Sequence, residues 1–211
     1  MLVSMKCLRR TNEERSATTR ARILDATAAC LMERGYAGTS TTQIAKMAGV
    51  SRGAQLHHFP IKSELMGAAV EHVFVRRKEE FQQAFLSLPD ETDKISAAID
   101  LLWNSLQTGV FYAWLELVVA SRSDEVLKER LLVVCQRFDR DITDLVQTLF
   151  NPPPEALEQL HVAGHLLFAS VEGLCTSQIV YGRHRSCDEM LALLKTIVHQ
   201  GLRPYLKGVS L

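Results

Sequence analysis

Apolar residues recur at helical spacing along most of the chain. In the first clear stretch, Leu24, Ala28, Leu31 and Met32 stand at i, i+4, i+7 and i+8, and Gly35 follows as a helix stop. No stretch of the sequence alternates apolar and polar residues over the length that a strand needs. The pattern therefore predicts an all-α fold.

Hydroxyl side chains that can cap a helix, and Gly or Pro residues that end one, divide this pattern into segments. The capping candidates are Thr41 or Thr42, Ser51 and Ser63, and the stops are Gly49, Phe59-Pro60 and Pro89. We expect helices over residues 17–34, 41–49, 51–58, 63–88, 92–108, 110–121, 124–150, 155–183 and 187–206. Between residues 160 and 181 apolar or small residues occupy most of the circumference, which indicates burial on more than one side.

Length and composition narrow the class of protein. A chain of 211 residues is long enough for a small domain joined to a larger one. Its apolar runs fall far short of the roughly 20 residues of a membrane span, and the N-terminus turns basic without the apolar stretch of a secretory signal. The five cysteines are odd in number and widely spaced, which is typical of reduced thiols. We therefore expect a cytoplasmic protein.

The formal net charge of zero hides an asymmetry along the chain. Residues 1–62 hold ten Lys/Arg against four Asp/Glu, a net charge of +6, and the rest of the chain carries −6. A basic first third followed by an acidic remainder of the chain indicates that the N-terminal segment binds a polyanion. The alternative is a chance imbalance of solvated surface charge.

The segment from Thr41 to Ala54 has the build of a helix-turn-helix. Gly49 can adopt the positive φ of the tight turn, Ala45 is small enough for two helices to cross closely, and the apolar residues between them supply a buried face. Any helical hairpin could use such residues. The capped third helix with its outward polar residues, the basic excess, and the closing run from His57 to Lys62 favour a DNA-binding motif.

The residues from Arg22 to Leu65 resemble the DNA-binding domain of the tetracycline-repressor (TetR) family of regulators. The family usually has an apolar residue followed by Tyr in its third helix, where this chain has Gln55 and Leu56, which puts the family's tyrosine contact with the DNA backbone in question. Farther along, the likeness is in length, helicity and helix order, apart from residues 111–124, which look like a subgroup of these regulators. The matching residues are Ile44-Ala45-x-x-Ala48-Gly49-Val50-Ser51-x-Gly53 and His57-His58-Phe59-Pro60-x-Lys62-x-x-Leu65.

This resemblance implies a transcription regulator, most simply a repressor, that binds a palindromic double-stranded operator as a homodimer and is released by a small-molecule effector. Its parts would be a basic arm over residues 1–15, either reaching DNA or disordered, a helix-turn-helix domain over 16–62, and a helical ligand-sensing and dimerisation domain over 63–211. A DNA-binding dimer without a sensor is the first alternative. An all-α enzyme is the second, but the sequence holds no nucleophile motif, phosphate loop or full metal set, so we expect no catalysis, cofactor or metal.

The third helix would lie in the major groove of DNA. Arg52 could bond guanine and Gln55 adenine, while Thr42, His57 and Lys62 are better placed for phosphate, as the resemblance also implies. For the histidine pair, the alternative is that one packs on Phe59 and the other is merely solvated. The full set of candidate DNA-binding residues is Thr41, Thr42, Ser51, Arg52, Gly53, Ala54, Gln55, His57, His58 and Lys62.

One face of the 155–183 helix carries polar groups within an otherwise apolar helix, which could line a cavity opposite aromatic residues of earlier helices. The candidate pocket residues are Trp103, Phe111, Trp114, His165, Phe168 and Glu172. The alternative is that the polar groups face water and the aromatics are plain core. His161 and His165, at i and i+4, could also hold a metal with Glu172 or a cysteine, but third and fourth ligands are not evident.

The opposite side of the same helix is made of small and aliphatic residues that allow close helix approach. Together with the last helix it could form a four-helix interface between two copies of the chain. The candidate interface residues are Val162, Leu166, Ala169, Gly173, Leu194 and Val198. Such a dimer would place two reading helices roughly 34–36 Å apart, one turn of DNA.

Overall fold

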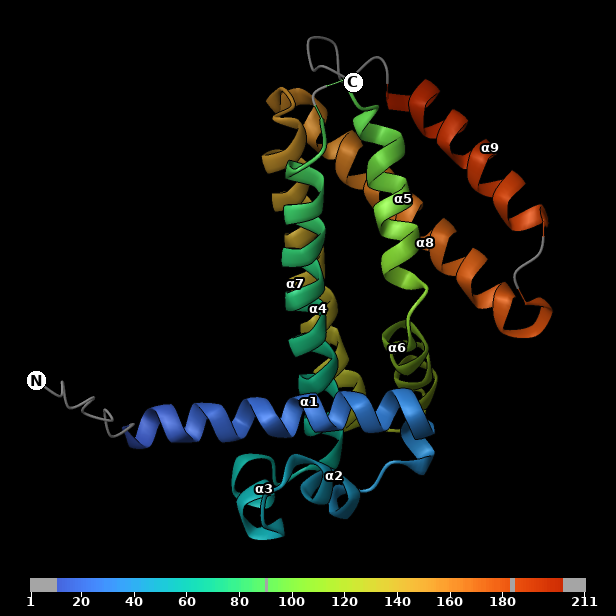
Figure 1. Cartoon of the computed structure of the whole chain (residues 1–211). Helices are drawn as coiled ribbons and strands as arrows, with labels where there is room; N and C mark the ends of the chain where they lie inside the picture. Colours follow the sequence, from blue (N-terminus) through green and yellow to red (C-terminus); the bar gives the residue numbers. More distant parts are fainter. Residues whose placement is uncertain (1–10, 90, 183–184, 203–211) are drawn as a thin grey trace, which may run out of the picture. The chain divides into compact units, whose positions relative to one another are not determined.

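The computed structural model describes residues 11–89, 91–182 and 185–202, and every regular element within them is a helix (Figure 1), which confirms the predicted fold class. The elements are α1 (Asn12–Gly38), α2 (Thr41–Ala48), α3 (Arg52–His58), α4 (Lys62–Leu86), α5 (Lys94–Leu106), α6 (Gly109–Ala120), α7 (Glu125–Phe150), the short 3₁₀ turn η1 (Pro154–Ala156), α8 (Leu157–Tyr181) and α9 (Arg185–Leu202). No helix in this part of the chain combines the length and apolar character that crossing a membrane requires.

The first helix begins earlier than its apolar pattern predicts. Thr11 and Glu14 form a reciprocal capping box, in which Thr11 Oγ1 accepts from Glu14 N at 3.1 Å and Glu14 Oε2 accepts from Thr11 N at 2.8 Å. The end of the predicted arm is therefore helical, and residues 1–10 lie outside the described residues. The sequence around this cap is polar, so apolar periodicity gives no indication that the helix begins there.

Gly35 and Gly49 adopt backbone conformations that a side chain would strain. Gly35 has φ +67° and interrupts α1 where the sequence predicts a stop, and a Cβ there would collide with the Glu116 carboxylate. Gly49 ends α2 in the left-handed conformation with φ +62°, as predicted for the tight turn.

Capping differs from the prediction at two helices. Ser40, rather than Thr41 or Thr42, caps α2, with its Oγ accepting from Gln43 N at 3.3 Å. Ser63 lies inside α4, where its hydroxyl donates to Asp124 Oδ2 at 2.7 Å instead of capping the helix. Both predicted cap residues were therefore wrong by one or two positions, although α2 begins at Thr41 as expected.

The described residues divide into two compact units, one of residues 11–72 with 113–130 and the other of 73–112 with 131–202. The first unit contains the helix-turn-helix but extends past residue 62, where the sequence places the end of that domain. In it α1 packs against α2, and α2 against α3 (Figure 1). Its fully buried side chains include Ile23, Leu24, Leu31, Ile44, Leu65, Met66, Val70, Leu117 and Leu127.

In the second unit α5, α8 and α9 pack on one another (Figure 1). Asp93 caps α5 and its other carboxylate oxygen lies 2.9 Å from His199 Nε2, while Lys195 and Asp100 form an ion pair at 2.6 Å, so polar contacts at the surface hold α9 to α5. The core beneath them is formed by Ile95, Ile99, Trp103, Phe111, Ala156, Leu160, Val171, Cys175, Cys187 and Leu191.

Candidate nucleic-acid interface and apolar cavity

The turn between α2 and α3 is fixed by hydrogen bonds at both of its ends. Val50 N donates to Ala45 O at 3.0 Å, and the left-handed Gly49 closes α2. Ser51 then caps α3 as predicted, with its Oγ accepting from Ala54 N at 3.1 Å. These contacts set the orientation of α3 before any partner binds.

Arg22 of α1 also stabilises this turn, through hydrogen bonds to two of its carbonyl groups. Its Nη2 donates to Ala48 O at 2.6 Å and to Gly49 O at 3.2 Å, so the guanidinium satisfies the carbonyls that end α2. Arg20 lies over the ring of Phe59, with 5.1 Å between the guanidinium carbon and the ring centroid. The Arg22 guanidinium is therefore engaged within the fold.

The outward face of α3 carries Arg52, Gly53, Leu56 and His57, all of which are exposed. They stand at i, i+1, i+4 and i+5, so they share one side of the helix. Leu56 was missed by the sequence reasoning, which treated it only as a departure from the family pattern. Its spacing of four residues from Arg52 was the signal that could have placed it on this face.

Gln55 corrects the sequence prediction, because its side chain is fully buried and cannot present an amide to a base in this structure. Its Nε2 donates to Phe59 O at 3.0 Å across the last turn of α3. Gln55 thus occupies the inward position where the family usually has an apolar residue. Its Oε1 has no hydrogen-bond partner among the described residues, which makes it a costly group to bury.

The other candidate DNA-binding residues surround this face. Thr42 and Ser51 are exposed, and Thr41, Ala54 and His58 are half-buried. The rings of His57 and His58 meet edge to face, with their centroids 5.5 Å apart.

Lys62 opens α4 and is half-buried. Its ammonium lies 4.8 Å from the centroid of the Tyr36 ring, and its Nζ donates to Tyr36 O at 3.4 Å. The ammonium is therefore positioned by the end of α1.

Hydrogen bonds join residues 113–130, which belong to the first unit, to α1 and α4. Tyr36 N donates to Glu116 Oε2 at 2.6 Å. Asp124 Oδ2 accepts from the Tyr36 hydroxyl at 3.1 Å and from the Ser63 hydroxyl at 2.7 Å, and Asp124 Oδ1 accepts from Leu127 N at 2.9 Å. The Leu127 N–H and the Ser63 hydroxyl hold the pKa of the Asp124 carboxyl below its usual value. One carboxylate thus joins the end of α1, the start of α4 and the start of α7.

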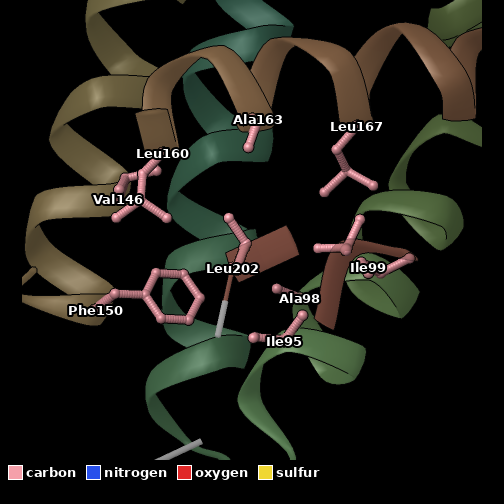
Figure 2. A pocket seen from close by; sticks show the side chains of 11 residues that line it. Ile95, Ala98, Ile99, Val146, Phe150, Leu160, Ala163, Leu167 and Leu202 are labelled. Atoms are coloured by element: carbon pink, nitrogen blue, oxygen red, sulfur yellow. The ribbon is translucent and has the colours of Figure 1, made fainter. Parts of the chain in front are cut away.

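The second unit contains an apolar cavity of about 80 Å³ between α5, α7, α8 and α9 (Figure 2). Every side chain that lines it is apolar, and in the close-up those of Phe150, Leu160 and Ile99 point toward the same space from three different helices. The lining residues are Ile95, Ala98, Ile99, Val146, Phe150, Leu160, Ala163, Gly164, Leu167, Val198 and Leu202.

None of the six predicted pocket residues lines this cavity. Trp103 and Phe111 belong to the buried core, which is the alternative that the sequence left open. Phe168 packs on Phe138, with ring centroids 4.6 Å apart. Trp114 is a half-buried residue of the first unit, and Glu172 is a half-buried residue of the second. The prediction followed the polar side of α8, whereas the cavity is on the side of Leu160, Ala163, Gly164 and Leu167.

The two histidines of α8 take part in a polar chain with α7. His161 Nδ1 lies 2.7 Å from Thr143 Oγ1, His161 Nε2 lies 3.0 Å from His165 Nε2, and the latter lies 3.2 Å from Asp139 Oδ1. Among the described residues, no group of three or more His, Cys, Asp or Glu side chains is arranged to hold a metal ion.

The predicted interface residues separate into two groups. On α8, Val162, Leu166, Ala169 and Gly173 are exposed, as a surface for another copy requires, and a Cβ added at Gly173 would meet nothing within 4 Å. On α9, Leu194 and Val198 instead pack inward against the core, and Val198 lines the cavity.

The large apolar side chains of α9 that are exposed are those of Met190, Leu193 and Ile197. The register predicted for this helix was therefore wrong by one residue. The outer and inner sides of α9 are both apolar, so periodicity alone does not distinguish them.

Comparison with known proteins gives a consistent assignment. The family model described as "Bacterial regulatory proteins, tetR family" matches residues 23–69. An uncharacterized HTH-type transcriptional regulator of Mycobacterium tuberculosis is 34% identical over 193 residues, which cover 92% of this chain and 99% of that protein.

Two crystal structures share the fold. A protein of Mesorhizobium loti assigned to the TetR family superposes with a TM-score of 0.69 at 19% identity, over 90% of this chain and 98% of that one. The transcriptional regulator FadR of Bacillus subtilis, in complex with stearoyl-CoA, superposes with a TM-score of 0.62 at 15% identity, over 86% and 98% of the two chains.

Proposed function

Because this chain belongs to the tetR family of bacterial regulatory proteins and is a transcription regulator rather than an enzyme, we propose that it is a repressor that binds a palindromic operator as a homodimer and leaves it when a small molecule binds. The observation that carries this proposal is the outward face of α3, which presents Arg52, Leu56 and His57 on a turn already fixed by Ser51, Gly49 and Arg22. A repressor of bacterial genes works where the chromosome lies, so we place the protein in the cytoplasm.

Arg52 and Leu56 are suited to base readout in the major groove. The Arg52 guanidinium has the donor geometry for guanine O6 and N7, and the exposed Leu56 side chain is suited to a thymine methyl group. Gly53, between them on the same face, lets the backbone approach the groove.

Backbone contacts would hold the protein in register on the duplex. Thr42 near the N-terminus of α2, His57 on α3, and Lys62 at the start of α4 carry donors suited to phosphate. The ammonium of Lys62 is already oriented by Tyr36, so a phosphate contact there would cost little side-chain entropy.

The dimer would form through α8 and α9. Val162 and Leu166 are 61% and 67% exposed, and Leu193 and Ile197 of α9 are 59% and 55% exposed. Large apolar side chains with this much exposure are costly unless another surface covers them. A twofold axis would join α8 and α9 of the two copies in a self-complementary four-helix contact, and each copy would contribute one α3 helix to the operator.

The effector would act by binding the operator-free conformation more tightly than the operator-bound one, since equal affinity for both shifts nothing. The apolar cavity of the second unit is the site we assign to it. FadR of Bacillus subtilis, which has the same fold, was crystallised with stearoyl-CoA, a ligand with a long apolar chain.

Selection from genomic DNA fragments with the purified full chain, followed by footprinting, tests this function. We expect enrichment of a palindrome whose two half-sites lie about 10 base pairs apart and are protected on the same face of the duplex. Binding that shows no sequence preference above the non-specific level at moderate salt would contradict it.

A further inference from the structure

We propose that this chain recognises a short uncharged hydrocarbon group of its effector and holds that group in the cavity between α5, α7, α8 and α9. This inference rests on the proposed function. The occupied cavity then acts on the dimer, because α8 and α9 carry both its wall and the exposed apolar surface. The ligand chemistry and the route of regulation follow from different observations.

The chemistry follows from the lining. Eleven residues from four helices line the space, and each is an aliphatic residue, an aromatic residue or glycine (Figure 2). A carboxylate or ammonium moved into such a space would lose its hydration with no partner to replace it, a cost that a hydrocarbon group does not meet. Two carboxylates at this end of the unit, Asp93 and Asp100, are already paired with His199 and Lys195 of α9.

The size follows from the volume. The cavity measures about 80 Å³, which is roughly half of the 150 Å³ apolar cavity known to hold benzene and far below the roughly 300 Å³ of a complete ligand pocket. It therefore fits a short alkyl end, with the rest of the effector outside it.

Three small residues create this space. Ala98 on α5 and Ala163 and Gly164 on α8 stand where a larger aliphatic side chain would fill the cavity. Gly164 already faces Ile142, whose Cγ2 would lie 3.2 Å from an added Cβ, so Ala98 and Ala163 are the positions where a larger side chain has room.

The coupling between the cavity and the dimer follows from neighbouring residues of α8 and α9 that lie on different faces of each helix. On α8, Ala163 and Leu167 line the cavity while their neighbours Val162 and Leu166 are exposed. On α9, Val198 lines the cavity while Ile197 is exposed. A group that fills the cavity pushes on the inner faces of the helices whose outer faces would meet the second copy. Since packed helices shift as rigid units, ligand binding and dimer geometry are coupled.

The test uses propane as the uncharged probe, propanoate as its matched carboxylate, and octanoate as an amphiphile whose charged end can stay outside. Binding to the full chain is followed by methyl NMR of the lining isoleucine, leucine and valine residues, and operator binding is measured on the same samples. We expect propane to shift these methyl signals and weaken operator binding, and propanoate to bind about tenfold or more weakly. Octanoate binding that propane displaces would identify an amphiphile's chain as the source of the hydrocarbon group.

Ala163→Leu fills the cavity and should lower propane affinity about tenfold or more. Ala97→Leu is the matched control, because Ala97 neighbours Ala98 on α5 but does not line the cavity, and it should leave the affinity within about twofold. If Ala163→Leu does not fold, Ala98→Leu repeats the test from α5. Equal binding of propane and propanoate, or propane binding unaffected by the filled variants, overturns the inference.

Operator binding of the unliganded wild type separates the two proposals. A chain that binds its operator but neither binds propane nor responds to it retains the proposed DNA-binding function and refutes the hydrocarbon site. A chain that binds propane in the cavity but has no operator refutes the proposed function while keeping the site.

Discussion

At the scale of single residues, neighbours on α3 have opposite roles. Arg52 is exposed on the outward face, and Gln55, three positions later, is fully buried with its amide bonded to Phe59 O. Both are polar side chains on the recognition helix, and residue type alone assigns both to base readout. The outward side chain of Arg52 is available to contact DNA, whereas the inward side chain of Gln55 stabilises the end of α3.

The two alanine variants should therefore differ in kind. Arg52→Ala should weaken binding to the specific operator by about 1–3 kcal/mol and leave thermal stability unchanged, because a base contact is lost at the surface. Gln55→Ala should lower stability by about 1–3 kcal/mol, because Phe59 O loses its donor and a buried volume empties.

Thermal unfolding and anisotropy titrations against operator and random DNA measure both effects. Gln55→Ala, once folded, should retain the ratio of operator to random-sequence affinity that Arg52→Ala loses. Selective loss of operator affinity in a fully stable Gln55→Ala protein would show that the buried position of Gln55 is not the one that binds DNA.

At the scale of elements, the order, type and approximate bounds of the helices could be predicted from apolar spacing together with Gly and Pro. The α2–α3 turn was predicted well because Gly49 and Ser51 act locally. What could not be predicted depends on partners distant in sequence, such as the Ser63 hydroxyl that bonds Asp124. The apolar cavity was not predicted for a related reason, since only the packing of four helices shows that the side of Ala163 leaves a space.

Asp124 offers a test of how residues 113–130 support the first unit. Its pKa is lowered by the Leu127 N–H and the Ser63 hydroxyl, so the folded protein favours the charged form more than the unfolded chain does. The resulting stability is present above the unfolded pKa of about 3.9 and is lost as the pH falls through the lower folded value.

Asp124→Asn should therefore lower the melting temperature by about 2–4 °C near neutral pH. The gap between the variant and the wild type should close as the pH falls below about 4. Calorimetry of the two proteins across this range makes the measurement, and the control is Asp144→Asn, within helix α7, which begins directly after Asp124. A gap that stays constant with pH would mean that the charge of Asp124 contributes nothing.

At the scale of the whole molecule, the proposed dimer depends on exposed apolar side chains of α8 and α9. Leu166→Glu places a charge at the centre of that surface, where Leu166 is 67% exposed. The variant should remain folded and become monomeric at micromolar concentration, because a buried unpaired charge costs several kcal/mol at an interface. Sedimentation velocity measures the result, with Leu132→Glu on α7, 57% exposed in the wild type, as the control. A dimeric Leu166→Glu would exclude this face of α8 from the interface.

The central claim is that two copies of the chain read a palindrome through their α3 helices. The most direct measurement is the sedimentation of the chain on the selected operator and on the same operator with one half-site scrambled. We predict two chains on the intact palindrome, with an affinity at least about a hundredfold above that for the scrambled duplex, since each base contact contributes about 1–3 kcal/mol. One chain per palindrome, or equal affinity for the two duplexes, would contradict the account.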